Sequence, residues 1–293
     1  LMDVDETPPA AAEAVVHLTE TVWKFVTSLS DVVLLYGPRG EGKSVGGVAG
    51  MLYHAERQTA RPVRWAVVRD TWVNVERTVL ETIKDGHREG WWDAEFIKGG
   101  EKVLINGDLL RLDCFGMDTM PDTHKFQGME LAGLWIDEAA AVSDLSTGVP
   151  LFVLQIAVTS MRQRGVDQWR LQLTENAPDD DHYSMHLREV FGDAIRVETF
   201  QIPPGENKYL PVGYREKMRA ALKDRPDLIA RLVEGRPGMS VIGEAVVPTF
   251  SRDLHVAKEP LPVFSAFEII RLWDAGSGDL HPAVVFIQAD PRL

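Results

Sequence analysis

The chain has 293 residues, of which 45% are hydrophobic and 26% charged. This composition is that of a globular protein with one large domain or two ordinary ones, and it excludes a chain that is disordered throughout. The formal net charge of −13 excludes a protein that coats nucleic acid indiscriminately, because such binding depends on lysine and arginine neutralising phosphates. A motor that touches DNA with a few loops needs only a local basic patch.

No apolar run reaches the roughly 18 residues needed to cross a bilayer, and the N-terminus lacks the basic start of a secretory signal. We therefore expect the protein to work inside a cell. The single cysteine, Cys114, has no disulfide partner and no zinc-site pattern around it, so we expect a small residue of a buried strand.

In chain order, helical spacing of apolar residues predicts an amphipathic helix over residues 10–28. A buried strand over 31–36, a helix over 43–58, a strand over 63–68 and a helix over 73–83 are expected next. Residues 92–113 carry short alternating runs separated by Gly-Gly and Asn-Gly-Asp, which predicts β-hairpins inserted at the sheet edge. A strand over 131–136, a helix over 150–161 and a strand over 169–173 follow.

Strands alternating with helices imply parallel βαβ units, in which ligands bind at the carboxyl ends of the strands. Beyond residue 203 the pattern changes to short helices over 212–223 and 226–233 and a proline-containing stretch over 248–262. Strands over 267–273 and 283–288 end the chain. We predict an ATPase core over 1–203, a lid or linker subdomain over 204–262 and a further domain beginning at 263.

The first predicted strand leads into a phosphate-binding loop with the pattern GxxxxGK[ST]. In such a loop, glycines let backbone N–H groups close around phosphates, the lysine reaches the β- and γ-phosphates, and the hydroxyl binds Mg²⁺. The loop consists of Gly37, Pro38, Arg39, Gly40, Glu41, Gly42, Lys43 and Ser44. Its place between a strand and a helix favours a P-loop NTPase fold over a glycine turn without a ligand.

The strand over 131–136 ends in Asp137 and Glu138. An aspartate there can hold the Mg²⁺ shell, and the adjacent glutamate can orient and deprotonate the attacking water. The alternative is a helix cap after a core strand, since acidic residues favour helix starts. Because the pair follows both an apolar strand and a P-loop, we predict an ATPase site with Lys43, Arg39 and Glu138 as catalytic residues.

Thr174 and Asn176 follow another predicted strand, where a hydroxyl and an amide can bind the γ-phosphate or the water. Taken alone, these two residues are better explained by turn chemistry, since Asn-Ala-Pro is a good turn. Arg39, inside the loop, is expected to neutralise phosphate charge. Arg162 or Arg164 is a candidate arginine finger acting on a neighbouring subunit's nucleotide, although exposed arginines are usually just solvated. His182, His186 and the acidic run 179–181 are expected to be surface residues.

Together these motifs resemble one family, the large terminase subunit of tailed bacteriophages, along nearly the whole chain. The resemblance is carried by the arginine within the P-loop, by Val-Val-Arg-Asp-Thr-Trp at 67–72 with Glu-Arg-Thr at 76–78, by the approach and acidic motif at 126–139, and by Leu-Thr-Glu-Asn-Ala-Pro at 173–178 with His182 and Tyr183 beyond. It implies an ASCE, RecA-like α/β ATPase. It also implies that Thr174 and Asn176 couple hydrolysis to movement.

The last segment, Leu-Trp-Asp-Ala-Gly at 272–276 with His-Pro-Ala-Val-Val-Phe at 281–286, resembles the opening hairpin of the terminase nuclease, an RNase H-like domain. Asp274 matches its first metal-binding carboxylate, and such nucleases use two divalent ions, Mg²⁺ or Mn²⁺. The segment is shorter than the roughly 50 residues of the smallest domains. We therefore expect a fragment in which the endonuclease of the full-length protein is inactive.

The resemblance implies an ATP- and Mg²⁺-dependent motor that moves double-stranded DNA into a procapsid in the cytoplasm of an infected bacterium. Its implied partners are the DNA, the portal protein and the small terminase subunit, with a homo-oligomeric ring when docked and a monomer in isolation. The alternatives are a helicase, which normally has a second RecA-like core, and a nucleotide-gated assembly scaffold without turnover. A small-molecule kinase is the weaker alternative, because Glu138 suits water as the acceptor.

Overall fold

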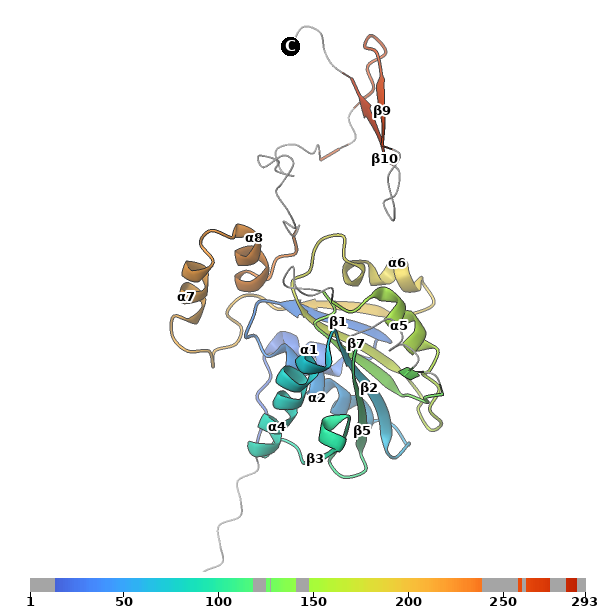
Figure 1. Cartoon of the computed structure of the whole chain (residues 1–293), viewed down its shortest axis with the longest axis vertical. Helices are drawn as coiled ribbons and strands as arrows, with labels where there is room; N and C mark the ends of the chain where they lie inside the picture. The colour runs from blue at the N-terminus through green and yellow to red at the C-terminus, as the bar shows by residue number, and fades with distance from the viewer. Residues whose placement is uncertain are drawn as a thin grey trace, which may run out of the picture. The chain divides into compact units, whose positions relative to one another are not determined.

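The computed structural model describes residues 14–117, 125–126, 128–140, 148–238, 258–259, 262–274 and 283–288 (Figure 1). The chain forms two compact units, Leu1–Ile242 and Gly243–Leu293. Within the described residues, no helix is both long and apolar enough to span a membrane.

The first unit is built on an eight-stranded sheet with the order β3-β4-β5-β2-β6-β7-β1-β8. The six strands from β5 to β8 in this order pair in parallel, and β3 and β4 are antiparallel. The predicted α/β class with a mainly parallel sheet is confirmed. The strands are β1 (Val32–Gly37), β2 (Val63–Arg69), β3 (Ala94–Ile97), β4 (Lys102–Ile105), β5 (Leu110–Gly116), β6 (Gly133–Asp137), β7 (Arg170–Asn176) and β8 (Val197–Gln201).

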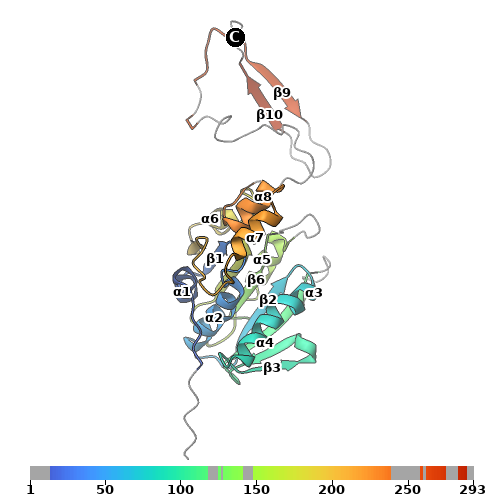
Figure 2. The same ribbon diagram turned by 90° about the vertical axis from the view of Figure 1, so that its left-hand side faces the viewer.

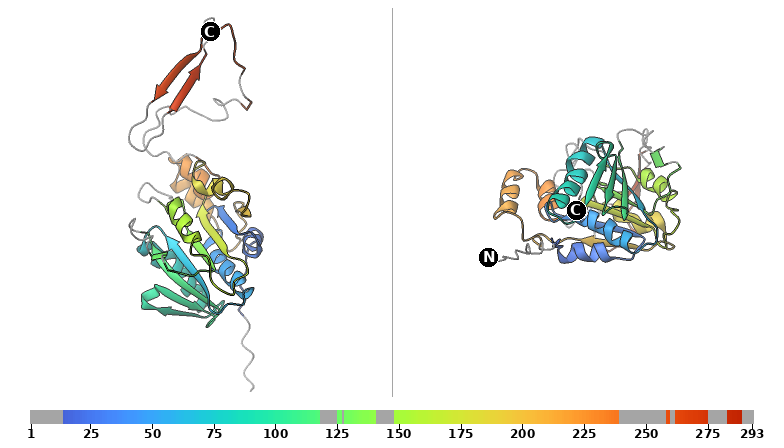
Figure 3. Two further views of the ribbon diagram at one scale, coloured as in Figure 1. Left: turned by 90° about the vertical axis from the view of Figure 1, so that its right-hand side faces the viewer. Right: turned by 90° about the horizontal axis from the view of Figure 1, so that it is seen from below.

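Helices flank the sheet, as Figures 1 and 3 show. Every residue of β1, β6 and β7 is buried, which is typical of parallel strands covered on both faces. On one face, Val48 and Met51 of the helix after the P-loop pack in a cluster with Trp65 and Trp135; on the other, Leu154 packs in a cluster with strand residues. The helices of the core are α1 (Glu20–Thr27), α2 (Lys43–Glu56), α3 (Trp72–Asn74), the π-helical turn η1 (Val75–Leu80), α4 (Glu81–Arg88), α5 (Leu151–Val158), the 3-10 turn η4 (Tyr183–His186) and α6 (Leu187–Phe191), with a second 3-10 turn, η2 (Lys98–Gly100), beside β3.

The first predicted helix is shorter than expected. It begins at Glu20; residues 14–19 are not helical, and residues 10–13 lie outside the described chain. The reason is a tertiary contact, because the carboxylate of Glu206 accepts a hydrogen bond from the Thr21 N–H at 2.8 Å and from the Thr21 hydroxyl at 3.1 Å. Glu206, which follows β8 in the chain, thus satisfies the N-terminus of the helix, and the residues before the helix line a cavity described below.

The predicted β-hairpins are present as β3, β4 and β5, and β5 also pairs in parallel with β2. The hairpins therefore extend the central sheet. The edge strand β8 was not predicted. Its residues are exposed or half-buried, so they give no apolar run, and β8 is fixed by parallel pairing to β1.

After β8, α7 (Tyr214–Ala221), α8 (Pro226–Leu228) and the π-helical turn η5 (Ile229–Val233) form a small helical group, orange in Figures 1 and 2. They fit the helices predicted over 212–223 and 226–233. We call residues 204–238 the lid; the predicted boundaries of the three domains stay predictions.

In the second unit, β9 (Ile270–Asp274) and β10 (Ala283–Ile287) form the predicted antiparallel hairpin. Most of the proline-containing stretch 248–262, Gln127 and the hairpin residues 275–282 lie outside the described chain.

Candidate nucleotide site

The P-loop connects the end of β1 to the start of α2. Gly40 and Gly42 both have φ of 84°, a left-handed conformation that glycine adopts without steric cost. These turns direct the loop backbone around the N-terminus of α2, where N–H groups without helical partners attract anions. Ser44, the second residue of α2, is half-buried beside the loop.

Lys43 lies inside this loop and is 8% exposed. Its Nζ donates to the carbonyl oxygens of Gly37 at 3.1 Å and Pro38 at 2.6 Å, and to Oδ1 of Asn176 at 3.1 Å. Burial lowers the pKa of Lys43, and the carboxylates of Glu138 and Asp137 oppose that shift. The ammonium group is therefore held where the loop, β6 and β7 meet.

Asp137 ends β6 and is 2% exposed. Its Oδ1 accepts from the Thr174 hydroxyl at 2.8 Å, and its Oδ2 accepts from Nη1 of Arg69 at 2.7 Å. The Thr174 hydroxyl in turn accepts from Nε1 of Trp135 at 2.8 Å. Thr174 thus orients the predicted Mg²⁺ ligand, a role that sequence reasoning did not assign to it.

Glu138 has φ of 56°, in the region that non-glycine residues rarely occupy. Its N–H donates to the Thr174 carbonyl at 2.7 Å, and its two carboxylate oxygens accept from Nδ2 of Asn176 at 2.9 and 3.0 Å. Burial, and then the charge of Asp137, raises the pKa of Glu138. Asn176 therefore links the P-loop lysine to the predicted base.

Glu41, a P-loop residue predicted to bind nucleotide, turns its fully buried side chain toward the lid. Its carboxylate accepts from the N–H groups of Gly205 at 3.0 Å and Asn207 at 2.7 Å, and also pairs with Arg215 of α7. Nδ2 of Asn207 donates to the Gly40 carbonyl at 2.7 Å. Glu41 thus joins the loop to the lid.

A second lid contact reaches the end of β7. Arg231 of η5 is 2% exposed; its Nε donates to the carbonyl of Ala177 at 2.8 Å and its Nη1 pairs with Asp179 at 3.2 Å. The backbone N–H of Arg39 donates to the Leu232 carbonyl at 2.8 Å. Asp179, expected in a solvated turn, is therefore an ion-pair partner of the lid.

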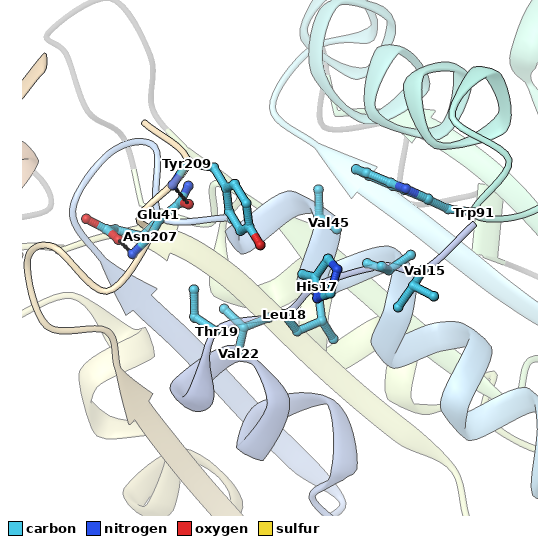
Figure 4. Close-up of a pocket in the computed structure, with 12 residues that line it drawn as sticks. Val15, His17, Leu18, Thr19, Val22, Glu41, Val45, Trp91, Asn207 and Tyr209 are labelled. Carbon is cyan, nitrogen blue, oxygen red and sulfur yellow. Dashed lines mark hydrogen bonds between the residues drawn. The ribbon is translucent and has the colours of Figure 1, made fainter. Parts of the chain in front are cut away.

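A cavity of about 320 Å³ adjoins the loop. Figure 4 shows Val22 and Val45 on its walls beside the ring of Tyr209, with Trp91 at one side. Glu41 and Asn207 supply polar groups next to Gly42. Ligand pockets commonly combine apolar walls with a few polar groups, so this cavity can hold a flat, largely apolar group attached to a bound phosphate.

The other predicted site residues lie elsewhere. The side chain of Arg39 is exposed at the loop, whereas Arg162 and Arg164 are exposed in the segment before β7, at the amino ends of the strands. Asp274 ends β9 of the second unit, and its side chain lies outside what the structure describes.

His182 departs from its predicted place on the surface, because it is half-buried and its Nδ1 lies 2.8 Å from the Ser184 hydroxyl. His186 is also half-buried, with its Nε2 3.0 Å from the Asp180 carbonyl. Both belong to or cap the turn η4, which the sequence pattern did not predict.

The oxygen donors of Ser44 and Asp137 suit Mg²⁺, which is usually held by one or two protein oxygens together with phosphates. Across the part of the chain that the structure describes, no three or more His, Cys, Asp or Glu side chains gather in a way that could hold a metal by themselves.

No family model and no curated protein matches the sequence. Among solved structures, the large terminase of a thermophilic bacteriophage in complex with ADP has a TM-score of 0.63 at 16% identity over 94% of this chain and 66% of that chain. The same terminase with ATP-gamma-S has a TM-score of 0.61 at 17% identity over 89% of this chain and 62% of that chain. The ATPase domain of the Thermus phage P74-26 large terminase has a TM-score of 0.52 at 14% identity over 75% of this chain and 93% of that chain.

This chain therefore spans about two thirds of the length of the thermophilic phage terminase. The likeness establishes the fold: the chain has the α/β P-loop NTPase fold of phage large terminases.

Proposed function

We propose that this chain is the ATPase region of a phage DNA-packaging motor, which hydrolyses ATP to move double-stranded DNA into a procapsid. The observation that carries the proposal is the chain of contacts from Lys43 through Asn176 to Glu138, at the carboxyl ends of three parallel strands. Ligands of open parallel sheets bind at this edge. The terminase-like fold supports the choice of motor.

In this proposal Lys43 and the loop backbone bind the β- and γ-phosphates. Glu138 accepts the proton of the attacking water, and Asn176 holds the Glu138 carboxylate on the γ-phosphate side. Ser44 and Asp137 would hold Mg²⁺, which neutralises phosphate charge when bound. Because the carboxylates of Asp137 and Glu138 are held by hydrogen bonds before ATP arrives, they need little reorganisation at the reaction step.

The cavity beside Gly42 would take the nucleobase, since it opens next to the phosphate loop and offers the Tyr209 ring and apolar walls. Its lining includes Thr19 and Asn207, whose polar side chains can bind the edge of a base. ATP bound this way touches the loop and the lid together.

Coupling to movement would use the two lid contacts. Glu41 ties the lid to the P-loop, and Arg231 ties it to the segment just after Thr174 and Asn176. Loss of the γ-phosphate would change the hydrogen-bond partners of Lys43 and Asn176. It would thereby shift the end of β7, where Arg231 binds the carbonyl of Ala177.

The remaining assignments extend this proposal. They are phosphate binding by Arg39, a ring docked on the portal, recruitment by a small terminase subunit, an arginine finger from Arg162 or Arg164, and a nuclease metal bound by Asp274 in the full-length protein. A finger supplied by a neighbouring subunit is worth about 10³- to 10⁵-fold in rate where such fingers operate. Activity in the cytoplasm of an infected bacterium also belongs to the proposal.

The test is phosphate release by the wild-type chain, Lys43→Ala and Glu138→Gln, with ATP binding measured in parallel. We expect Glu138→Gln to bind ATP as wild type does but to hydrolyse it about 10²- to 10⁴-fold more slowly, the usual worth of a general base. Lys43→Ala should lose binding. Wild-type turnover in Glu138→Gln would show that the base is assigned wrongly, and ATP binding without turnover in the wild type would favour the scaffold.

A further inference from the structure

Glu175 is a buried carboxyl group that the proposed mechanism does not use. It lies in β7 between Thr174 and Asn176, and its side chain is fully buried. Side chains alternate along a strand, so Glu175 points to the face opposite its two neighbours. A carboxylate placed there is costly unless donors satisfy it.

Among the described residues, each of the two oxygens of Glu175 accepts a hydrogen bond. Oε2 accepts from the backbone N–H of Ala140 at 2.9 Å, and Oε1 accepts from the hydroxyl of Ser184 at 2.5 Å. Ala140 is only two residues beyond Glu138, and Ser184 belongs to η4. Glu175 therefore connects the segment carrying the proposed base to the turn that packs behind it.

Further hydrogen bonds close a ring around the same segment. The N–H of Val149 donates to the Ala139 carbonyl at 2.9 Å, and the Tyr183 hydroxyl donates to the Val149 carbonyl at 2.8 Å. Tyr183 is followed in the chain by Ser184, whose hydroxyl donates to Glu175, so this set of contacts forms a closed ring. Glu175 thus reaches the backbone of the 138–140 segment with a side chain that starts on β7, whereas the Asn176 side chain reaches the Glu138 carboxylate.

The segment needs such support because of its backbone. A non-glycine residue in the left-handed region costs about 1 to 3 kcal/mol and persists only where the surroundings over-determine it. Glu138 has φ of 56°, and in this conformation its carboxylate accepts from Asn176. Two bonds from β7 fix it, one from Glu138 N–H to the Thr174 carbonyl and one from Ala140 N–H to Glu175.

We propose that Glu175 is a positioning residue for Glu138, holding the backbone of residues 138–140 so that the Glu138 carboxylate stays on Asn176. This rests on the proposed function, in which Glu138 is the general base. Releasing Ala140 lets the segment relax, and misplacement of a catalytic group by about 1 Å costs up to about 10²-fold in rate. Lys43 and the P-loop are untouched, so ATP binding is retained.

The experiment compares two variants of similar side-chain volume in the full 293-residue chain. In Glu175→Gln the amide oxygen can accept from Ala140 and the amide nitrogen can donate to Ser184, so kcat should stay within about threefold of wild type. In Glu175→Met no acceptor remains, and kcat should fall by about 10- to 100-fold. The Kd for ATP should stay within about twofold in both.

The proposal is overturned if Glu175→Met has the kcat of wild type, or if Glu175→Gln loses as much kcat as Glu175→Met does. It is also overturned if Glu175→Met loses ATP binding to the same extent as kcat. If Glu175→Met fails to fold, Glu175→Asp makes the same test, because its side chain is one methylene too short to keep both contacts; a lowered kcat supports the proposal and a wild-type kcat overturns it.

Glu138→Gln is measured alongside to separate the two claims. If wild type and Glu138→Gln release phosphate at the same background rate, the proposed function fails and this proposal fails with it. If Glu138→Gln is inactive and Glu175→Met is as active as wild type, only the positioning role is wrong.

Discussion

At the scale of single residues, the site depends on charged groups that lie inside the protein. Arg69 and Asp137 are paired at 2.7 Å with side chains only 15% and 3% exposed. Removing one partner of a buried pair leaves the other without compensation, which costs more than the pair itself contributes. Arg69 is therefore the counter-charge on which the proposed Mg²⁺ ligand depends.

We expect Arg69→Gln to lower the free energy of unfolding by about 3 kcal/mol, as for other broken buried pairs. Urea denaturation gives the measurement. Arg77→Gln, which changes an exposed arginine of η1, is the matched control and should stay within about 0.5 kcal/mol of wild type. Equal stability of the two variants would contradict the counter-charge role.

Glu175 gives a pH dependence of stability. Burial raises the pKa of Glu175 to about 7. The charge of Glu138 also raises this pKa, whereas the hydrogen bonds from Ser184 and Ala140 and the charge of Arg231 lower it. Burial raises the pKa values of Tyr36 and Tyr183, and the charge of Glu175 raises them further. A carboxyl group whose pKa is raised on folding binds its proton more tightly in the folded state than in the unfolded state. Protonated Glu175 therefore stabilises the folded protein fully below its unfolded pKa near 4.5, and this stabilisation is lost as the pH rises through about 7.

The wild type should therefore lose about 3 kcal/mol relative to Glu175→Gln between about pH 4 and pH 8. Other titrating groups are common to both proteins and cancel in the difference. Denaturant unfolding at both pH values is the measurement. A difference between the two proteins that does not change with pH would mean that Glu175 does not titrate in this range.

Local sequence patterns were sufficient to predict where the P-loop, Asp137 and Glu138 lie in the fold. The P-loop, Asp137 and Glu138 each follow a recognisable strand, and the structure brings them to one edge of the sheet. Arg69 and Asp137 are 68 positions apart, and Glu175 and Ala140 are 35 apart. Their pairing depends on strand order, which no local pattern contains.

At the scale of elements, the lid is fastened to the P-loop by Glu41. Three hydrogen-bond donors, two of them backbone N–H groups of residues 205 and 207, converge on a fully buried carboxylate. Hydrogen bonds to a charged group are each worth about 1.5 to 3 kcal/mol. The lid should therefore open through the loss of this contact.

We expect Glu41→Ala to speed amide hydrogen exchange of Gly205 and Asn207 by about 10- to 100-fold, which corresponds to the loss of one such bond. The amides of β1 and β7 should be unchanged. Lys217→Gln, an exposed change on α7, serves as the control. If exchange at Gly205 and Asn207 stays at the wild-type rate, the lid is held by other contacts.

Elements with strong patterns were predicted well because burial on both faces produces apolar runs, as in β1, β2 and β6. The edge strand β8 and the turn η4 were not, because half-exposed residues give no such run. The start of α1 was also wrong: helical spacing continues upstream of Glu20, but Glu206 caps the helix there.

At the scale of the whole molecule, the proposed motor has a net charge of −13, so it would have to bind DNA through local contacts. Binding through phosphate contacts weakens steeply with salt, by about 10³- to 10⁵-fold between about 50 and about 200 mM when six to ten phosphates are neutralised. A motor of this composition should lose its DNA response over that range, while its basal hydrolysis should change little because Lys43 and Asp137 of the proposed ATP site are buried.

The most direct measurement is phosphate release by the full chain with and without double-stranded DNA, at low and physiological salt and over a range of protein concentrations. The account predicts that duplex DNA stimulates hydrolysis by about tenfold or more at low salt, and that Glu138→Gln abolishes this hydrolysis. If a neighbouring subunit supplies an arginine, the rate should also rise more than proportionally with protein concentration. Hydrolysis that depends on Glu138 but is indifferent to DNA at every salt and protein concentration would contradict the motor.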